Sequence, residues 1–412
     1  MAGAVLPAMA PVVSSLYPRS AEPVPAVRQI AVLRANAVGD FVVGLPALEA
    51  LRRAYPSARI MLLGRRWHVE FLCDRPGPVD EAVELPQVPG VTTDPDAPAD
   101  EAEIEAFVQR MRARRFDLAL QLHGGGRYSN PFLLRLGASM TVGMRSPDAA
   151  PLDRSLPYVD DHHPVVLQLL ECVALAGAVA GSLEARLRLR PCDVAEAHAV
   201  LPLSPPCTSA PPRSERDLRE GKQRPGGGSA TPAQPLVVLQ PGASHVHKRW
   251  HPERFAAVGD AFADRGAQVA VNGGPDEARL TQQVCRAMRA PAIDLAGRLS
   301  VGGLAALLAR ARLLVSNDTG PAHLARAVGT PTVTVFWVGN ARSFGPLSTR
   351  WHRIATSWRM NCPLCGANAM TEGCGHEVSL VDDVPVEAVL ALSEDLYQAE
   401  VQRPFPLLQA AQ

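Results

Sequence analysis

A carboxylate at the end of a small-residue turn is the first group in this sequence that could do chemistry. The segment 33–40 runs from an apolar stretch through small residues to Asp40. A carboxylate on a loop after a strand can reach a substrate hydroxyl and act as a general base. Asp40 could equally stabilise the start of a helix, because negative charge is favourable at a helix N-terminus. Both roles stay open at this point.

A second segment, residues 239–252, combines groups that bind phosphate. The Pro-Gly turn at 241–242 exposes backbone N–H groups, and Ser244 and Lys248 follow it. Amides, a hydroxyl and a mobile ammonium together suit an anion. Lys248 and Lys222 are the only lysines among 41 basic residues, which favours a specific role for Lys248 over that of a solvated basic loop.

A third segment, residues 314–325, predicts a strand, a polar turn and a helix whose first turn contains Pro321. Asp318 or Thr319 stands near the helix cap, and the unpaired N–H groups of the helix start could bind a diphosphate. Asp318 would repel an anion, so we expect it to orient neighbouring groups or a sugar hydroxyl. A capped helix without a ligand is the alternative.

The fourth segment, residues 271–277, again joins a strand, a glycine turn and an acidic helix start. Asp276 or Glu277 could bind ribose hydroxyls, or either could cap the helix. Neither G-x-G-x-x-G nor G-x-x-x-x-G-K-[ST] occurs in the chain, so the standard dinucleotide and P-loop sites lose support.

A cysteine cluster lies near the C-terminus, where Cys362, Cys365, Cys374 and His376 form a C-x2-C-x8-C-x-H pattern. Three thiols and an imidazole could hold a structural zinc ion, although the C-x-H spacing is atypical. Free or packed thiols and a disulfide are the alternatives. Eight cysteines in 412 residues are too few for a disulfide scaffold, so a reducing compartment fits best.

The elements that must position these groups alternate between short β-branched runs and longer amphipathic segments. That alternation predicts an α/β fold with two doubly wound parallel sheets. The expected strands are 30–33, 60–63, 118–122, 236–239, 268–271, 313–315 and 332–336. The expected helices are 39–55, 252–265, 277–288, 301–310 and 321–328.

A stretch rich in proline and glycine divides the chain into two halves. Such a composition cannot bury enough apolar surface to offset its ordering entropy. The expected parts are a disordered leader 1–29, an N-terminal Rossmann-like domain 30–203, a linker or disordered insertion 204–235, a C-terminal Rossmann-like domain 236–380 and a helix and tail 381–412. We expect the last helix, 385–397, to pack on the N-terminal domain.

Composition excludes several classes of protein. The chain is 47% hydrophobic and has 41 basic and 41 acidic residues, so no global field attracts nucleic acid. The best candidate for a membrane span, residues 165–183, contains Gln168 and Glu171. No secretory signal precedes the first strand. We therefore expect a cytoplasmic protein.

Taken together, the motifs resemble glycosyltransferase family 9, the heptosyltransferases of the lipopolysaccharide inner core. The resemblance rests on residues 34–40 with 46–48 and 51–52, 240–243 with 248–250, 273–275 and 316–323. It implies a GT-B fold, two Rossmann-like domains facing across a cleft. The N-terminal domain would bind the acceptor and the C-terminal domain the activated sugar, ADP-heptose above all.

The resemblance also implies roles for individual residues. Asp40 would deprotonate the acceptor hydroxyl, and the sugar would be transferred with inversion. Asp318 and His323 would shape the sugar site. The donor diphosphate would be held by Ser244, Lys248, Thr319 and Gly320. The resemblance further implies that no metal is required for catalysis in such a site.

The residues that would bind the acceptor have a weaker sequence signal than those that would bind the donor. His123 follows a strand and begins a glycine-rich turn, and with Arg65 and Arg145 it could contact a phosphorylated acceptor. The expected acceptor is a lipopolysaccharide core or related lipid-linked saccharide, reached by peripheral contact with the inner membrane. Two other functions remain open: a GT-B-like epimerase of the nucleotide sugar, and a catalytically idle nucleotide-sugar-binding protein.

Overall fold

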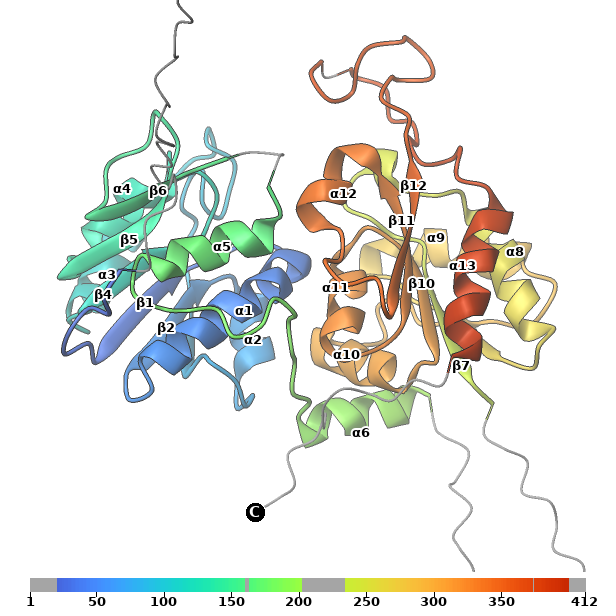
Figure 1. Ribbon diagram of the computed structural model, residues 1–412, viewed down its shortest axis with the longest axis horizontal. Helices are drawn as coiled ribbons and strands as arrows, with labels where there is room; N and C mark the ends of the chain where they lie inside the picture. Colours follow the sequence, from blue (N-terminus) through green and yellow to red (C-terminus); the bar gives the residue numbers. More distant parts are fainter. Residues whose placement is uncertain (1–20, 160–162, 202–233, 373, 400–412) are drawn as a thin grey trace, which may run out of the picture. The chain divides into compact units, whose positions relative to one another are not determined.

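The structure is a computed structural model that describes residues 21–159, 163–201, 234–372 and 374–399. It contains two compact units (Figure 1). Of the described residues, the first unit comprises 21–36, 43–73, 77–159 and 163–183, and the second comprises 37–42, 74–76, 184–201, 234–372 and 374–399. Most of the expected leader and nearly all of the expected Pro/Gly-rich segment lie outside the described residues.

The first unit is built on a parallel sheet with strand order β3-β2-β1-β4-β5-β6. The strands are β1 Gln29–Leu33, β2 Arg59–Gly64, β3 Glu81–Glu84, β4 Leu118–Gln121, β5 Met140–Arg145 and β6 Arg154–Pro157. The helices are α1 Val38–Ala54, α2 Arg66–Leu72, α3 Glu101–Arg112, α4 Ser129–Arg135 and α5 Val165–Ala174.

Alternation along β1 explains how this sheet is covered on both faces. Ala31 and Leu33 belong to one core cluster together with Phe107 of α3 and Phe132 of α4. Ile30 and Val32 point to the opposite face, where Figure 1 shows α1 and α5, and they are fully buried as well. A strand that is apolar on both faces is typical of a parallel sheet between two helical layers.

The second unit repeats this plan with strand order β12-β11-β10-β7-β8-β9. The strands are β7 Leu236–Gln240, β8 Gln268–Val271, β9 Ile293–Asp294, β10 Leu313–Asn317, β11 Thr332–Trp337 and β12 His352–Ser357. The helices are α6 Pro191–Val200, α8 Pro252–Ala263, α9 Ala278–Ala287, α10 Val301–Arg310, α11 Gly320–Ala327, α12 Val338–Phe344 and α13 Val386–Gln398, with short 3-10 turns η1 Val246–Lys248 and η2 Pro275–Glu277.

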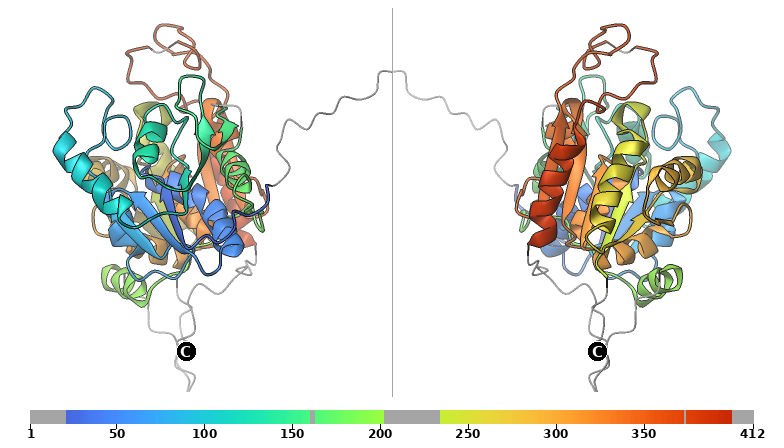
Figure 2. Two further views of the ribbon diagram at one scale, coloured as in Figure 1. Left: turned by 90° about the vertical axis from the view of Figure 1, so that its left-hand side faces the viewer. Right: turned by 90° about the vertical axis from the view of Figure 1, so that its right-hand side faces the viewer.

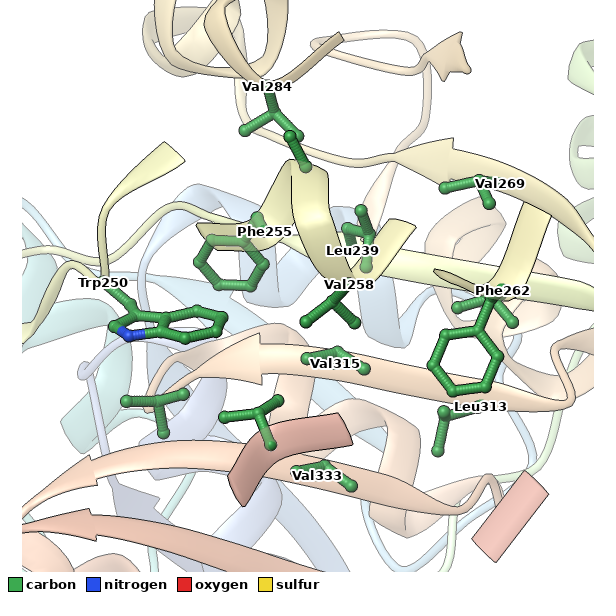
Figure 3. Packing of buried hydrophobic residues seen from close by; sticks show 14 of the residues in the cluster. Leu239, Trp250, Phe255, Val258, Phe262, Val269, Val284, Leu313, Val315 and Val333 are labelled. Atoms are coloured by element: carbon green, nitrogen blue, oxygen red, sulfur yellow. The ribbon is translucent and has the colours of Figure 1, made fainter. Parts of the chain in front are cut away.

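The main core of the second unit lies between this sheet and three helices. Phe255 and Phe262 of α8 pack over Leu239 and Val315 of the central strands (Figure 3). The Trp250 side chain, fully buried, packs edge-on against Phe255 with ring centroids 5.2 Å apart. Burial of large side chains of this kind contributes roughly 2–3 kcal/mol each.

The C-terminal helix differs from expectation. Val389 and Leu396 of α13 belong to the core cluster of the second unit, and α13 contacts α8, β10, β11 and β12 (Figures 1 and 2). The expectation that this helix packs on the N-terminal domain is therefore wrong, because its apolar face completes the other core. Similarly, α6 packs on α10 within the second unit, whereas the expected boundary at residue 203 placed it in the first domain.

In each sheet, successive strands are added on one side of the first strand and later strands on its other side. The strand order therefore reverses at one point in each sheet. In the first unit this point lies between β1 and β4, and in the second between β7 and β10. Open α/β sheets bind ligands at the carboxyl ends of their strands beside such a reversal. All the strands and core helices expected from the sequence are present within one to three residues of their predicted bounds. In the described part of the chain, no helix is long and apolar enough to cross a membrane.

Candidate functional site

Asp40 lies in the first turn of α1, two residues after the helix begins, so it is not the N-cap residue. Residues 37–42 pack with the second unit, where the start of α1 closely approaches the start of α11. A Cβ on Gly39 would lie 3.0 Å from Cδ2 of His323, and one on Gly320 would lie 3.2 Å from Cβ of Val38. Glycine at both positions lets the two helix starts meet, which brings Asp40 near His323.

Lys248 and Asp318 form an ion pair at the reversal point of the second sheet. Lys248 ends the η1 turn after β7, and Asp318 follows β10 directly, so neighbouring parallel strands place them together. The Lys248 Nζ lies 3.1 Å from Asp318 Oδ2, with side chains 21% and 6% exposed. The predicted phosphate-binding lysine is thus already oriented by a buried carboxylate.

Asp318 is held in its charged form by this environment. Burial alone would raise the pKa of Asp318, but hydrogen bonds and charges from His323 and Lys248 outweigh burial, so its pKa is lowered. Asn340, which follows β11, also donates to Oδ2 of Asp318. The carboxylate therefore contacts Lys248, His323 and Asn340, and its predicted role beside a sugar hydroxyl stays a prediction.

His323 connects this pair to a buried arginine. The Arg326 Nη2 lies 2.6 Å from Nδ1 of His323, and the Nε2 of His323 lies 3.7 Å from Oδ1 of Asp318. Burial and the charge of Arg326 lower the pKa of His323, although Asp318 and Asp40 oppose this change. Burial also lowers the pKa of Arg326 to about 10. Lys248, Asp318, His323 and Arg326 form a continuous row, called the charged row below.

The loop that carries Lys248 is fixed by side chains of the sheet. Asn317, at the end of β10, donates through Nδ2 to the carbonyl of Pro241 at 2.7 Å and accepts through Oδ1 from the Trp250 N–H at 3.1 Å. Arg249 donates to the carbonyl of Ala243 at 3.0 Å. Both ends of the loop are therefore tied to β10, which keeps Lys248 in place.

Asp276 and Glu277 lie shortly after the end of β8, and their side chains have different surroundings. Glu277 Oε2 accepts from the Gly274 N–H at 2.9 Å, which confirms the capping alternative for Glu277. Its carboxylate also occupies the space beside Gly242, where a Cβ would overlap it. Asp276 is exposed. A donor-binding role for either carboxylate stays a prediction.

The other predicted diphosphate residues lie around the same reversal point. Thr319 is the N-cap of α11 in an extended conformation, and Gly320 is the first helical residue. Ser244 is exposed on the loop after β7. The N-terminus of α11 thus follows Asp318 directly, and its N–H groups add a positive potential to that of Lys248.

The three predicted acceptor residues lie at the carboxyl ends of three strands of the first sheet: Arg65 follows β2, His123 follows β4, and Arg145 is the last residue of β5. His123 Nδ1 accepts from the Ala35 N–H at 3.2 Å, and Arg65 Nε donates to the Ala35 carbonyl at 2.6 Å. Arg145 Nε instead donates to the Ala149 carbonyl at 3.1 Å. Burial, with Arg34 and Arg65 nearby, lowers the pKa of His123 to about 4, so this imidazole is neutral near pH 7.

The predicted metal ligands come together in the second unit. The ligand atoms of Cys362, Cys365, Cys374 and His376 all lie within 4.8 Å of one another. Backbone N–H groups of Cys365 and Leu364 lower the pKa of the Cys362 thiol to about 6. No disulfide joins the cysteines that the structure describes. This geometry fits a single metal ion with a thiolate-rich ligand set.

Three residues of this site were not predicted from the sequence. Asn317 lay within a quoted motif without a role, and Arg326 and Asn340 were not considered. Asn340 has the signal that pointed to Asp318, a polar residue shortly after a buried strand. Arg326 gave no such signal, because an arginine in the last turn of a helix is ordinarily exposed.

Comparison with known proteins identifies a family. The sequence pattern of glycosyltransferase family 9 (heptosyltransferase) matches residues 104–365, more than half of the chain. Lipopolysaccharide heptosyltransferase 3 of Escherichia coli is 35% identical over 131 residues, which are 31% of this chain and 37% of the relative. The first curated relatives are thus matched over about a third of their own length.

Solved structures extend the likeness to the whole fold. A glycosyltransferase of family 9 from Veillonella parvula superposes with a TM-score of 0.69 at 19% identity, over 93% of this chain and 99% of that one. The E. coli heptosyltransferase WaaC with ADP gives a TM-score of 0.58 at 19% identity, over 89% and 99%. These likenesses show that the two sheets form the GT-B architecture expected from the sequence.

Proposed function

The chain belongs to glycosyltransferase family 9, and from that premise we propose that it transfers heptose from ADP-heptose to a lipopolysaccharide core or related lipid-linked saccharide. The observation that carries the proposal is the Lys248–Asp318 pair at the reversal point of the second sheet, beside the start of α11. A related fold binds ADP, and a relative matched in part is a lipopolysaccharide heptosyltransferase.

The proposed donor site binds the part of the substrate that gains charge. As the bond between the anomeric carbon and the diphosphate oxygen breaks, its electron pair moves onto the diphosphate. Lys248, Ser244 and the N–H groups at Thr319 and Gly320 stabilise this leaving group more strongly than the intact donor, which lowers the barrier. Asp318 holds Lys248 and, with His323, borders the sugar.

In the proposed reaction Asp40 is the base. Its carboxylate takes the proton of the acceptor hydroxyl while the oxygen attacks the anomeric carbon from the face opposite the diphosphate, so the configuration inverts. Asp40 lies near His323 and therefore near the donor residues. Neither step uses a metal ion, because Lys248 and the start of α11 supply the positive charge.

We assign acceptor binding to the first unit. His123 and Arg65 would contact the acceptor beside Ala35, and Arg145 would add a second cation further along the same sheet edge. The protein would work on the cytoplasmic side of the inner membrane, in peripheral contact with its lipid-linked substrate.

We also propose that Cys362, Cys365, Cys374 and His376 bind one structural zinc ion. Three thiolates and one imidazole complete a tetrahedral shell, which zinc prefers in structural sites. Such an ion would hold the chain together locally and would not contact the reacting groups.

Thermal unfolding with ADP, UDP or GDP tests the donor site. A nucleotide that binds the folded state stabilises it by about 2.7 kcal/mol at a hundredfold excess over its Kd. We expect ADP to stabilise most, Lys248→Ala to lose this response and Arg65→Ala to keep it. A preference for UDP or GDP would change the donor, and no response to any of the three would contradict the donor site.

A further inference from the structure

The cysteine loop, residues 358–378, leaves the second sheet after β12 and returns to it before α13. Both of its ends meet at Ser357, which is 1% exposed. The Ser357 hydroxyl donates to the carbonyl of Leu380 at 2.6 Å and accepts from the N–H of Arg359 at 3.2 Å. The loop is therefore closed at its base, and the metal-binding cluster lies within it.

The residues that follow the loop, 379–384, bind the loop that carries Lys248. The Leu380 N–H donates to the carbonyl of His247 at 2.8 Å, and the Ser379 hydroxyl donates to the carbonyl of Arg249 at 2.7 Å. These two carbonyls belong to the residues on either side of Lys248. We call residues 379–384 the brace, because they hold the Lys248 backbone from both directions.

Further bonds extend the brace beyond Lys248. Asp382 accepts from the His251 N–H at 2.9 Å, and the Val384 carbonyl accepts from the Trp250 indole at 2.9 Å. The first end of the cysteine loop contributes as well, since Trp337 donates to the Arg359 carbonyl at 2.7 Å and packs edge-on against His247. The brace and the base of the cysteine loop thus contact residues 247–251, the segment that contains Lys248.

The two halves of the cysteine loop differ in what holds them. Residues 360–369 form a hairpin, with bonds from the Cys362 N–H to the Ala367 carbonyl and from the Ala369 N–H to the Met360 carbonyl, both 2.8 Å. The other half, with Cys374 and His376, contains no helix or strand among its described residues. His376 is three residues from Ser379, so an ion that binds His376 to the hairpin restrains the start of the brace.

We propose that a metal ion bound at Cys362, Cys365, Cys374 and His376 strengthens binding of the nucleoside diphosphate by fixing the brace that positions Lys248. This inference rests on the donor site and the metal site proposed above. The ion contacts neither substrate, and its effect passes through the brace to one lysine. Because such coupling is reciprocal, the nucleotide also tightens metal binding by the same factor.

Isothermal titration of the full chain with ADP, before and after removal of the metal by a chelator, tests this coupling. Metal content is measured in parallel by mass spectrometry, which also tells zinc from iron. We expect one equivalent of zinc, ADP binding about tenfold weaker after its removal, equivalent to about 1.4 kcal/mol, and recovery on addition of zinc. Bound metal with an unchanged ADP affinity overturns the inference.

A serine pair tests the brace without touching the metal. Ser379→Ala removes the bond to the Arg249 carbonyl, whereas the control Ser393→Ala removes a buried bond to Val389 within α13. We expect Ser379→Ala alone to weaken ADP binding, at unchanged zinc content, although both variants lose part of their free energy of unfolding with the lost hydrogen bonds. Equal effects of the two variants on ADP affinity contradict the brace.

A double-mutant cycle separates positioning of Lys248 from general loosening. If the brace acts through Lys248, Ser379→Ala adds almost nothing to the loss of ADP affinity in Lys248→Ala. Additive losses overturn the inference. The failures are distinguishable: no bound metal refutes the metal site, no ADP binding by the wild type refutes the donor site, and metal and ADP binding without coupling refute only the brace.

Discussion

The carboxyl edges of the two sheets hold their charged side chains in different ways. On the first sheet, His123 and Arg65 are bound to the backbone of Ala35. On the second, the members of the charged row bind one another, from Lys248 through Asp318 and His323 to Arg326. One edge attaches its side chains singly to the main chain, and the other joins them into a network.

The difference predicts how each edge responds to change. Removing a side chain from the first edge leaves backbone groups unpaired that water can reach, because Arg65 is exposed. Removing one from the charged row leaves a buried charge without its partner, which is costly. Under the proposed function, the interdependent second edge would bind the donor diphosphate and the independently attached side chains of the first edge would bind the acceptor.

The largest effect should come from Asp40→Asn, which replaces the carboxylate of the proposed base. We expect kcat to fall by about 10² to 10⁴-fold, since the amide cannot accept the acceptor proton. ADP affinity should be unchanged. Steady-state kinetics of sugar transfer, with ADP titrations beside them, measure both. Retained turnover would assign the base elsewhere and leave Asp40 as a group that merely stabilises its helix.

Lys248→Met and Arg65→Met test the comparison directly, since each removes one cation from one edge. Lys248→Met leaves the buried Asp318 carboxylate short of a partner and should cost about 3 kcal/mol of unfolding free energy. Arg65→Met should cost less than about 1 kcal/mol. Urea unfolding measures both. Similar costs would mean that the charged row is no more interdependent than the first edge.

Acid should destabilise both units through histidines whose pKa is lowered in the folded state. Burial lowers the pKa of His68 in the first unit and of His352 in the second to about 3. Each must stay neutral in the folded state while the unfolded chain takes up a proton below about pH 6.5, so stability falls as pH drops below that value. From pH 7 to pH 5 the loss is roughly 2 kcal/mol per histidine.

Urea unfolding of His68→Gln and His352→Gln at the two pH values checks this dependence. Each variant should lose about 2 kcal/mol less than the wild type between pH 7 and pH 5. A variant with the wild-type dependence would show that its histidine is protonated in the folded protein.

The smallest effect is expected for Arg145→Met, on the first edge. Its guanidinium donates to the Ala149 carbonyl and is exposed, so folding and ADP affinity should hardly change. If Arg145 contacts the acceptor, the acceptor KM alone should rise, by about threefold to tenfold for an exposed charge. An effect on donor KM instead would place Arg145 with the other substrate.

The sequence predicted the parts of the fold whose signal is local. Short apolar runs such as Ile60–Leu63 and Leu313–Val315 predict central strands. Among strands, those covered on both faces are the ones that are apolar at successive positions. Edge strands carry no such run: β12 has the sequence His-Arg-Ile-Ala-Thr-Ser and was missed. The packing of α13 was wrong, since an apolar helix face does not say which core it covers.

In the candidate site too, the residues with a local sequence signal were predicted and the contacts between distant residues were not. Lys248, Asp318 and the cysteine cluster were found because their residue types stand close together in sequence or directly after strands. The pairing of Lys248 with Asp318 joins residues 70 positions apart, and the bond of Asn340 to Asp318 joins residues 22 apart. Such contacts depend on strand order, which follows from three-dimensional packing and not from local pattern.

The contact between Arg326 and His323 determines which ring nitrogen of His323 carries the proton. A guanidinium only donates hydrogen bonds, so Nδ1 of His323 must present its lone pair to Arg326 and carry its proton on Nε2, the side facing Asp318. An imidazole held in this tautomer has no lone pair directed toward Asp318. In this tautomer the Nε2–H dipole of His323 favours the negative charge of Asp318, and Nε2 cannot accept a proton from that side.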